Sequence, residues 1–346
     1  MIASYKKYVL NFKNPSGTSR GILTTKETWF IIIENNNNKK GIGECGLLRG
    51  LSVDDVPNYE QKLIWACNNI DKGFEWLWQE LLEYPSIQFG LETAFKSLAS
   101  EDPFLLFPSN FTQSHDKMLI NGLVWMGSES FMKTQIEQKI KQGFKCIKLK
   151  IGALNFDVEL GLIQFIRNHF SAQEIEIRVD ANGAFSASDA LQKLKKLADF
   201  NLHSIEQPIA KNQFIEMQTL CKTTPLPIAL DEELIGVFDI KDKEALIATI
   251  RPQFIILKPS FIGGFKGTLQ WISIAEKYNV KWWVTSALES NIGLNAIAQW
   301  TYLQNNLLPQ GLGTGGLYTN NFDCPLEVVD GFLQYNQKLK WNCNLI

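Results

Sequence analysis

The feature that most constrains the fold is a recurrence of short apolar runs through the last two thirds of the chain. Successive runs start 28, 29, 28, 24, 27, 27 and 29 residues apart. They are MLINGLV (118–124), CIKLKI (146–151), IEIRVDA (175–181), HSIEQP (203–208), PIALDE (227–232), FIILKP (254–259), KWWVTSAL (281–288) and QGLGTG (310–315). An interval of this length holds a strand, a turn and a crossover helix, so the pattern predicts successive parallel β/α units.

The segments between the runs support this interpretation. ALQKLKKLADF (190–200) and TLQWISIAEKYN (268–279) carry apolar residues at spacings of three and four, as an amphipathic helix requires. Eight such units favour a closed parallel barrel over an open doubly wound sheet, because no glycine fingerprint follows the first strand. Since the pattern stops after the eighth run, we expect an α/β fold of the (β/α)7β modified TIM-barrel type.

The two ends of the chain lack this rhythm. TKETWFIIIENNNNKKGIGECG (25–46) predicts a hairpin with an Asn-rich turn, and IQFGLETAFKSLAS (87–100) predicts a helix. PLEVVDGFLQYNQKLKW (325–341) again predicts strands. We therefore expect an α+β capping domain at 1–117, a catalytic barrel at 118–324, and a C-terminal segment at 325–346 that returns to complete the capping domain.

Composition excludes several classes of protein. With 45% hydrophobic and 20% charged residues the chain can build a large core. The 34 basic side chains are balanced by 36 acidic ones, and the basic residues form no continuous Lys/Arg run. Both observations argue against a nucleic-acid partner. Six scattered cysteines without CxxC spacing indicate reduced thiols in a cytoplasmic protein, and no apolar stretch suits a signal peptide or a membrane span. A homo-oligomer is compatible with the sequence, which does not determine the oligomeric state.

The run CIKLKI places Lys148 and Lys150 two residues apart, so both point to one face of the predicted strand. The interior of a barrel is normally packed with branched apolar side chains. Two lysines there must lie at the C-terminal mouth or pair with anions. The alternative is an exposed edge strand with two solvated lysines.

A carboxylate follows at the end of each of the next three strands. These residues, Asp180, Glu206 and Asp231, are 26 and 25 residues apart, one in each β/α unit. Converging carboxylates repel one another unless a cation joins them, and hard oxygen ligands select Mg²⁺, with Mn²⁺ as the alternative, over zinc. Acidic residues at strand ends can also cap the following helices. Three in register favour a metal site.

Lys258 ends the following strand, four strands round the predicted ring from the Lys148/Lys150 pair. A substrate could lie between the two groups. We expect clustered ammonium groups and a nearby divalent ion to depress a lysine pKa, which a lysine needs to act as a base near neutral pH.

The ordered set of KxK, Asp, Glu, Asp and Lys on five successive strands resembles the enolase superfamily in its muconate-lactonizing-enzyme subgroup. The resemblance covers nearly the whole chain, including the capping domain. Within the subgroup, the strings RVDANGAF, HSIEQPI and PIALDEE, together with PSGTSRG near the N-terminus, resemble the dehydratases of menaquinone biosynthesis. This resemblance implies a Mg²⁺-dependent lyase with a small-molecule carboxylate substrate, 2-succinyl-6-hydroxy-2,4-cyclohexadiene-1-carboxylate, from which water leaves by syn elimination.

The resemblance also implies roles for the charged residues. Lys150 would remove the proton α to the carboxylate and return it to the departing hydroxide. Lys148 would hold the carboxylate and help depress the Lys150 pKa, and Lys258 would stabilise the enediolate from the other face. The implied metal ligands are Asp180, Glu206 and Asp231.

Further residues are candidate substrate contacts. Arg178 and Asn182 flank Asp180 on its own face by the two-residue rule, so they either support the metal ligands or contact the substrate. The stretch PSGTSRG (15–21), which contains Arg20, predicts either a mobile capping loop over the mouth or a plain β-turn. SALESNIG (286–293) and GLGTGG (311–316) offer backbone N–H groups for anions, or turns that need glycine. The full set is Arg20, Arg178, Asn182, Ser286, Gly311 and Gly313.

Other chemistries on the same scaffold stay open: an N-succinylamino acid racemase, a dipeptide epimerase or a muconate cycloisomerase. Dipeptide epimerases of this family resemble one another in an Asp-x-Asp after the eighth strand, where this chain has GLGTGG, so a cationic substrate end is disfavoured. A non-catalytic relative is a further alternative, against which every position of the lysine and carboxylate set is filled. The sequence does not assign roles to Glu232 and Glu233, which directly follow Asp231.

Overall fold

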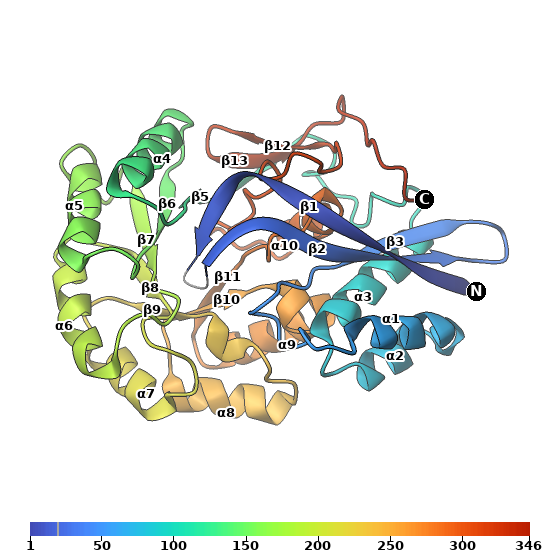
Figure 1. Ribbon diagram of the computed structural model, residues 1–346, viewed down its shortest axis with the longest axis horizontal. Helices are drawn as coiled ribbons and strands as arrows, with labels where there is room; N and C mark the ends of the chain where they lie inside the picture. The colour runs from blue at the N-terminus through green and yellow to red at the C-terminus, as the bar shows by residue number, and fades with distance from the viewer. Residues whose placement is uncertain (19–20) are drawn as a thin grey trace.

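The structure is a computed structural model that describes residues 1–18 and 21–346, and these residues form three sheets (Figure 1). An antiparallel sheet near the N-terminus has the order β1-β2-β3. A parallel sheet of seven strands, in the described part of the chain, has the order β11-β10-β9-β8-β7-β6-β5. A small antiparallel sheet has the order β12-β13-β4. This is the α/β fold with an N-terminal capping region that the sequence predicts.

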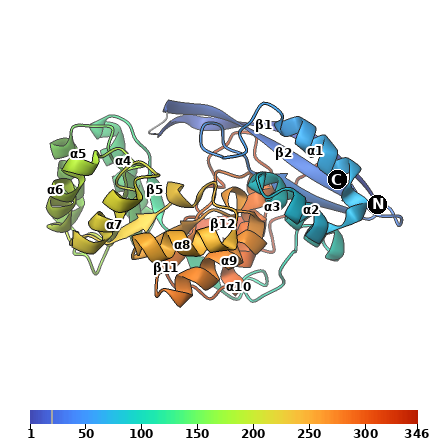
Figure 2. The same cartoon turned by 90° about the horizontal axis from the view of Figure 1, so that it is seen from below.

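The capping region combines the antiparallel sheet with a layer of helices. Its elements are β1 (Ile2–Thr18), β2 (Gly21–Glu34), β3 (Lys40–Cys45), α1 (Tyr59–Asn68), η1 (Ile70–Lys72), α2 (Phe74–Glu80) and α3 (Pro85–Ala99). β2 and β3 form the predicted hairpin, and α3 is the predicted helix. Trp29, Ile31 and Ile33 alternate along β2 and pack, fully buried, against Leu91 and Ala94 of α3. Figure 2 shows α1, α2 and α3 beside this sheet, well apart from α5 and α6.

The β1–β2 hairpin carries the capping region over the barrel (Figure 1). Residues 15–21 are predicted to form a capping loop or a plain β-turn; in the structure Ser16, Gly17 and Thr18 pair with Leu23, Ile22 and Gly21 as a continuation of the two strands. A further bridge joins Gly17 to Met126, just past the end of β5. The hairpin therefore reaches the carboxyl ends of the barrel strands, while Arg20 lies outside the described residues.

The parallel strands are short and buried on both faces, as a barrel requires. They are β5 (Gly122–Val124), β6 (Cys146–Lys150), β7 (Glu176–Asp180), β8 (Ser204–Glu206), β9 (Ile228–Leu230), β10 (Phe254–Leu257) and β11 (Lys281–Val284). Adjacent strands are in parallel register throughout. Parallel bridges from Thr285 to Gly311 and from Ile120 to Gln310 close the ring. The predicted (β/α)7β barrel is confirmed, with an eighth strand reduced to these bridges.

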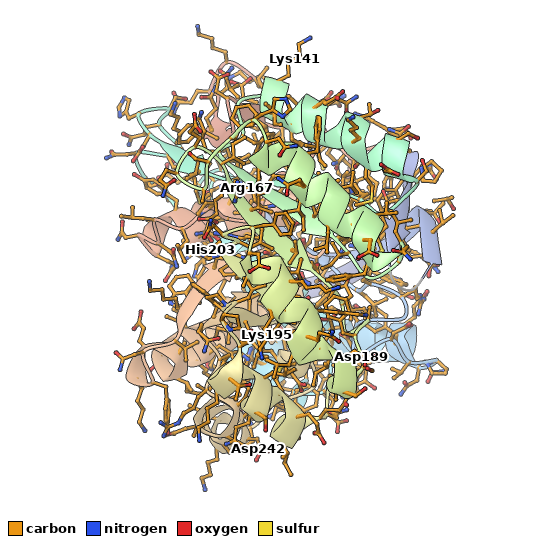
Figure 3. All side chains as sticks on the ribbon, turned by 90° about the vertical axis from the view of Figure 1, so that its left-hand side faces the viewer. Lys141, Arg167, Asp189, Lys195, His203 and Asp242 are labelled. Carbon is orange, nitrogen blue, oxygen red and sulfur yellow. The ribbon has the colours of Figure 1, made fainter. Side chains whose placement is uncertain are left out.

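Each crossover helix turns an apolar stripe to the sheet. The helices are α4 (Glu129–Lys141), α5 (Phe156–Arg167), α6 (Ala187–Ala198), α7 (Phe214–Thr223), α8 (Ile240–Ile250), α9 (Gly264–Lys277) and α10 (Asn291–Leu303). In α6, Ala190, Leu194 and Leu197 are fully buried at spacings of four and three. Asp189 and Lys195 lie on the opposite, solvent-facing side of the same helix (Figure 3). This amphipathic pattern is why the helices surround the barrel.

The first predicted barrel strand, 118–124, is divided in two. β4 (Lys117–Leu119) pairs antiparallel with β13 (Phe332–Tyr335), which in turn pairs with β12 (Leu326–Val329). Only β5 enters the barrel sheet. The division occurs because Ile120 N–H donates to Gly331 O while Asn121 N–H donates to Gln310 O, so adjacent residues bond to different sheets.

The C-terminal segment contacts both parts of the molecule. β12 and β13 lie in the small sheet with β4, beside the start of the barrel. Beyond them, Trp341 stacks on Phe104 with ring centroids 4.2 Å apart, and the last residues pack around Phe30 and Ile42 of the capping sheet. The domain limits at 117 and 324 stay predictions.

Candidate active site at the mouth of the barrel

A cavity of about 130 Å³ lies between the carboxyl ends of the barrel strands and the capping hairpin. The capping side contributes Leu23 of β2 to its wall, and the barrel contributes Lys148, Lys150 and Lys258. Lys148 and Lys150 extend from β6, whereas Lys258 directly follows β10, four strands away in the sheet order. The structure therefore brings the three predicted lysines to one cavity.

Lys148 lies at the centre of the charge network. Its Nζ pairs with Glu206 Oε2 and is 3.0 Å from Asp180 Oδ2. The side chains of all three residues are almost completely buried. They meet because β6, β7 and β8 are parallel neighbours, with Lys150 opposite Asp180 and Asp180 opposite Glu206.

Lys150 takes part in a second set of contacts at the end of β6. Its Nζ is 3.0 Å from Asp180 Oδ2 and donates to Asn182 Oδ1 at 2.8 Å. Asn182, whose φ is +44°, donates in turn from Nδ2 to Glu232 Oε1 at 3.0 Å. The side chain of Lys150 is thus oriented by groups on β7 and after β9.

Lys258 pairs with Asp231, the residue that directly follows β9. The two residues after Asp231 turn in different directions. Glu232 accepts the hydrogen bond from Asn182, and Glu233 accepts from Asn212 N–H at 3.1 Å. Glu232 therefore takes part in the network around Lys150, and Glu233 fixes the backbone of the preceding β/α loop.

The carboxylates dominate the electrostatics of the lysines. Desolvation would lower the pKa of Lys148, but Asp180 and Glu206 outweigh it and raise that pKa. Desolvation would likewise lower the pKa of Lys258, but the charges of Asp231 and Glu206 outweigh it and raise that pKa. The two lysine pKa values are raised because each ammonium group contacts a carboxylate, whereas the depressed pKa expected for the base beside a divalent ion concerns Lys150 and stays a prediction. Lys148 and Lys258 are both cationic at neutral pH.

The three carboxylates are suited to a hard cation. Burial and the Asp180 charge raise the pKa of Glu206, and Asp231 adds to the same effect. Among the described residues, Glu206 Oε1 is buried with no hydrogen-bond partner, so it has a free lone pair in a region of negative charge. No group of three His, Cys, Asp or Glu side chains in the described part of the chain is arranged to hold a metal as it stands; the carboxylates contact lysines instead. An all-oxygen set matches Mg²⁺ or Mn²⁺.

The predicted substrate contacts separate into two groups. Asn182, Ser286, Gly311 and Gly313 line the cavity. A Cβ on Gly311 would lie 2.4 Å from Thr285 Oγ1, so glycine is needed for the chain to approach β11.

Arg178 does not line the cavity; it lies deeper in the barrel. Its Nη1 donates to Pro309 O at 2.9 Å, and its guanidinium is 4.1 Å from the centre of the Trp283 ring. No substrate contact is available to it there.

Sequence reasoning missed the apolar wall of the cavity. It is formed by Leu23, Leu48, Trp125, Phe261 and Leu317, which come from the capping region and from loops after three different strands. No local pattern marks these residues, because single apolar side chains in loops resemble ordinary core residues. The wall gives a cavity that also holds charged side chains an apolar surface suited to a hydrocarbon ring.

Comparison with known proteins agrees with this geometry. Residues 132–339 match the family described as enolase C-terminal domain-like. An o-succinylbenzoate synthase from Desulfotalea psychrophila is 44% identical, and the match covers 96% of this chain and 98% of that protein. The chain therefore belongs to the enolase superfamily.

Solved structures extend the likeness. The crystal structure of MenC from Desulfotalea psychrophila has a TM-score of 0.85 and 41% identity, and the match covers 96% of this chain and 99% of that one. A dipeptide epimerase from Enterococcus faecalis, complexed with Mg and a dipeptide, has a TM-score of 0.83 at 18% identity, covering 97% and 96% of the two chains. The second likeness shows the fold alone.

No helix in the described residues has the length and apolar character that crossing a bilayer requires.

Proposed function

We propose that the protein is an o-succinylbenzoate synthase of menaquinone biosynthesis. It would remove water from 2-succinyl-6-hydroxy-2,4-cyclohexadiene-1-carboxylate to give 2-succinylbenzoate. The observation that carries the proposal is the pair of lysines, Lys150 and Lys258, that enter one apolar-walled cavity from strands four apart. The 44% identity to a synthase over nearly the whole chain supports the same reaction.

The cavity matches the parts of this substrate. Leu23, Leu48 and Trp125 provide an apolar surface for the six-membered ring. The ammonium groups that line the same cavity provide opposite charge for a carboxylate. Gly311 and Gly313 leave the backbone accessible for the succinyl arm, which carries a second carboxylate.

Lys150 is proposed as the base. As a free amine it takes the proton α to the ring carboxylate, and the electron pair of the broken C–H bond moves into the carboxylate to give an enediolate. When the C–O bond to the hydroxyl group breaks, the Lys150 ammonium returns the proton, and water leaves from the same face. The contacts to Asn182 and Asp180, at 2.8 and 3.0 Å, hold Nζ in place for both transfers.

Lys148 and Lys258 are proposed to act by charge rather than by proton transfer. Neighbouring carboxylates raise both pKa values, and the anionic substrate would take over this role in the complex, so we expect both lysines to stay protonated. Lys148 would bind the substrate carboxylate, and Lys258 would stabilise the negative charge that develops on it. Fixed charge at the place where charge develops is usually the largest single contribution to such catalysis.

Asp180, Glu206 and Asp231 are the proposed ligands of Mg²⁺. A bound divalent ion would supply a Lewis acid that offsets several kcal/mol of the cost of placing a second negative charge on the carboxylate. The lysines that now contact these oxygens would take up new contacts, and the substrate carboxylate is their natural partner.

The test is an ultraviolet assay of the purified protein with the cyclohexadiene substrate, beside N-succinylamino acids and an Ala-Glu dipeptide. We expect the absorbance of the aromatic product with the first compound and no epimerisation of the dipeptide. Turnover of N-succinylamino acids alone would replace the proposal with a racemase. No turnover of any compound in the presence of Mg²⁺ would favour a non-catalytic relative.

A further inference from the structure

Three buried charged residues that the proposed chemistry does not use lie where the capping sheet meets the barrel. Lys26 is on β2, Glu44 is on β3, and Glu289 lies between β11 and α10. Lys26 is 3% exposed, and both carboxylates are 0% exposed. We call these three residues the interdomain cluster. Charges are rarely buried so completely without a structural consequence.

Lys26 is held in the cluster by charge and not by hydrogen bonds. Among the described residues, its Nζ is buried with no hydrogen-bond partner. Desolvation lowers its pKa, and the charges of Glu44 and Glu289 oppose that shift. The two carboxylates offset only part of its desolvation, because the pKa of Lys26 is lowered on balance.

Glu44 fastens the capping sheet to the barrel. Its Oε1 accepts from Thr28 Oγ1 at 2.8 Å and from Ser290 N–H at 2.9 Å. Its Oε2 accepts from Ser290 Oγ at 2.5 Å and from Gly293 N–H at 2.9 Å. A carboxylate from β3 therefore takes up the free N–H groups at the start of α10, where negative charge is stabilised.

Glu289 joins two loops that border the cavity. It accepts hydrogen bonds from Ser260 Oγ, two residues after Lys258, and from Ala287 N–H at 2.7 Å. Ala287 and Leu288 line the cavity.

Leu288 is held in a costly backbone conformation. Its φ is +62°, which is rare for a bulky residue and is kept only when the surroundings enforce it. Tyr318 Oη donates to Leu288 O at 2.7 Å and helps to enforce it.

Two glycines allow the cap and the barrel to approach closely at this point. A Cβ on Gly46 would lie 2.6 Å from Ser260 Oγ and 3.0 Å from Glu289 Cγ. A Cβ on Gly293 would lie 2.8 Å from Glu44 Oε2. Such distances are too short for any side chain, so the contact is built around the cluster.

We infer that Lys26, Glu44 and Glu289 are positioning residues that couple the seating of the capping hairpin to the shape of the substrate cavity. Lys26 lies three residues from Leu23, which forms part of the cavity wall. Glu289 holds the Ala287–Leu288 backbone and the loop after Lys258. When the capping hairpin is seated, it brings the buried Lys26 side chain to the two carboxylates, whose hydrogen bonds hold both loops.

The consequence for catalysis rests on the proposed function. Loss of the cluster should weaken substrate binding more than it slows the chemical steps, because no member of the cluster lines the cavity. The cluster should therefore affect KM rather than kcat.

Amide hydrogen exchange tests the inference without reference to activity. The N–H groups of Ala287, Ser290 and Gly293 donate to Glu289 or Glu44, so their exchange rates report on the cluster directly. For Lys26→Met we expect exchange at these amides to rise about tenfold or more, because two buried carboxylates lose their counter-charge. We expect KM to rise by about tenfold and kcat to change by less than about threefold.

Lys243→Met is the matched control. Lys243 is 2% exposed on α8 and donates to Gln270 at 2.7 Å, away from the cavity. The Lys243→Met substitution should leave both the exchange rates at the three amides and KM unchanged. An equal effect of both substitutions would mean that general destabilisation, and not the cluster, controls the loops.

A second variant keeps the inference testable if Lys26→Met does not fold. The double variant Lys26→Met/Glu289→Gln has the same net charge in the cluster as the natural chain, and it should regain most of the protection that Lys26→Met loses. Glu289→Gln alone should speed exchange at Ala287, because a charge-assisted hydrogen bond becomes a neutral one.

The results separate the inference from the proposed function. Unchanged exchange in Lys26→Met and in Glu289→Gln, or strictly additive effects in the double variant, would overturn the inference even if the enzyme is active. Failure of the natural protein to turn over the cyclohexadiene would overturn the proposed function and leave the exchange result to decide the inference.

Discussion

The barrel contains two charged clusters on the same strands, and they differ in what surrounds them. At the mouth, Lys150 and Asp180 line a cavity. Two residues earlier on β7, Arg178 points to the same side of the sheet but is enclosed between Pro309 O and the Trp283 ring. The mouth cluster can exchange its internal partners for a ligand, and the deeper cluster cannot.

The deeper cluster consists of Glu176, Arg178, His203 and Trp283, of which Arg178 and Trp283 are enclosed by protein groups while Glu176 and His203 are partly exposed. Glu176 Oε1 accepts from Arg178 Nε at 2.7 Å and lies 4.0 Å from His203 Nδ1. His203 also stacks near Phe254, with ring centroids 4.7 Å apart. A buried charge alone does not identify a functional site; a charge beside an accessible cavity does so much better.

The largest expected effect is at the mouth. Lys150→Ala should lower kcat by about a thousandfold, because the proton-transfer group is lost, while the fold is kept. A steady-state ultraviolet assay measures kcat, and circular dichroism checks the fold. Lys145→Ala, which removes an exposed lysine just before the same strand, is the control. Residual activity above about a tenth of the natural protein would exclude Lys150 as the base.

The deeper cluster should show the opposite result. Arg178→Met should lower the free energy of unfolding by about 2 to 4 kcal/mol, because the ring contact and the ion pair with Glu176 are both lost. Urea denaturation measures this change, and kcat/KM of the folded protein should stay close to its natural value. A raised KM at unchanged stability would return Arg178 to the list of substrate contacts.

A smaller effect is expected on metal binding. Asp231→Asn should weaken Mg²⁺ affinity by about tenfold or more, because an anionic ligand becomes neutral. Isothermal calorimetry measures the affinity. Glu233→Gln is the control, since that neighbouring carboxylate accepts from Asn212 N–H, whereas Asp231 is the one that pairs with Lys258. Equal affinities in the natural protein and Asp231→Asn would remove Asp231 from the ligand set.

The smallest effect concerns pH. Desolvation lowers the pKa of His203 to about 4, against 6.5 in the unfolded chain. Below pH 6.5 the unfolded chain binds a proton that the folded protein excludes, so stability is lost as pH falls from 6.5 towards 4.

At pH 5.5 this loss amounts to about 1.4 kcal/mol. The difference in unfolding free energy between the natural protein and His203→Gln, measured at pH 7.5 and pH 5.5, should show it. A difference that does not change with pH would contradict the burial of a neutral imidazole.

The sequence predicted the mouth cluster well because strand periodicity and strand order together fix positions. Lys148, Lys150, Asp180, Glu206, Asp231 and Lys258 each end or nearly end a buried run, and parallel neighbours must bring such residues together. The same rule misplaced Arg178. Two-residue periodicity gives the face of a strand but not the depth along it, and only the packing of Trp283 and Pro309 decides that Arg178 is closed off.

Other features depend on contacts between distant segments. Residues 118–124 read as one strand, yet Asn121 divides them because β13 competes for the first half. The interdomain cluster had no signal at all: Lys26 stands in a polar stretch, TTKET, that resembles an exposed strand. Its burial follows only when β11 and α10 are placed against the capping sheet.

The most direct test of the account is the metal dependence of dehydration. The ultraviolet assay with 2-succinyl-6-hydroxy-2,4-cyclohexadiene-1-carboxylate should show no turnover after removal of divalent ions with a chelator, and full turnover after Mg²⁺ is added back. Turnover that persists in chelator would contradict the proposed role of Asp180, Glu206 and Asp231, and so would turnover that Mg²⁺ fails to restore.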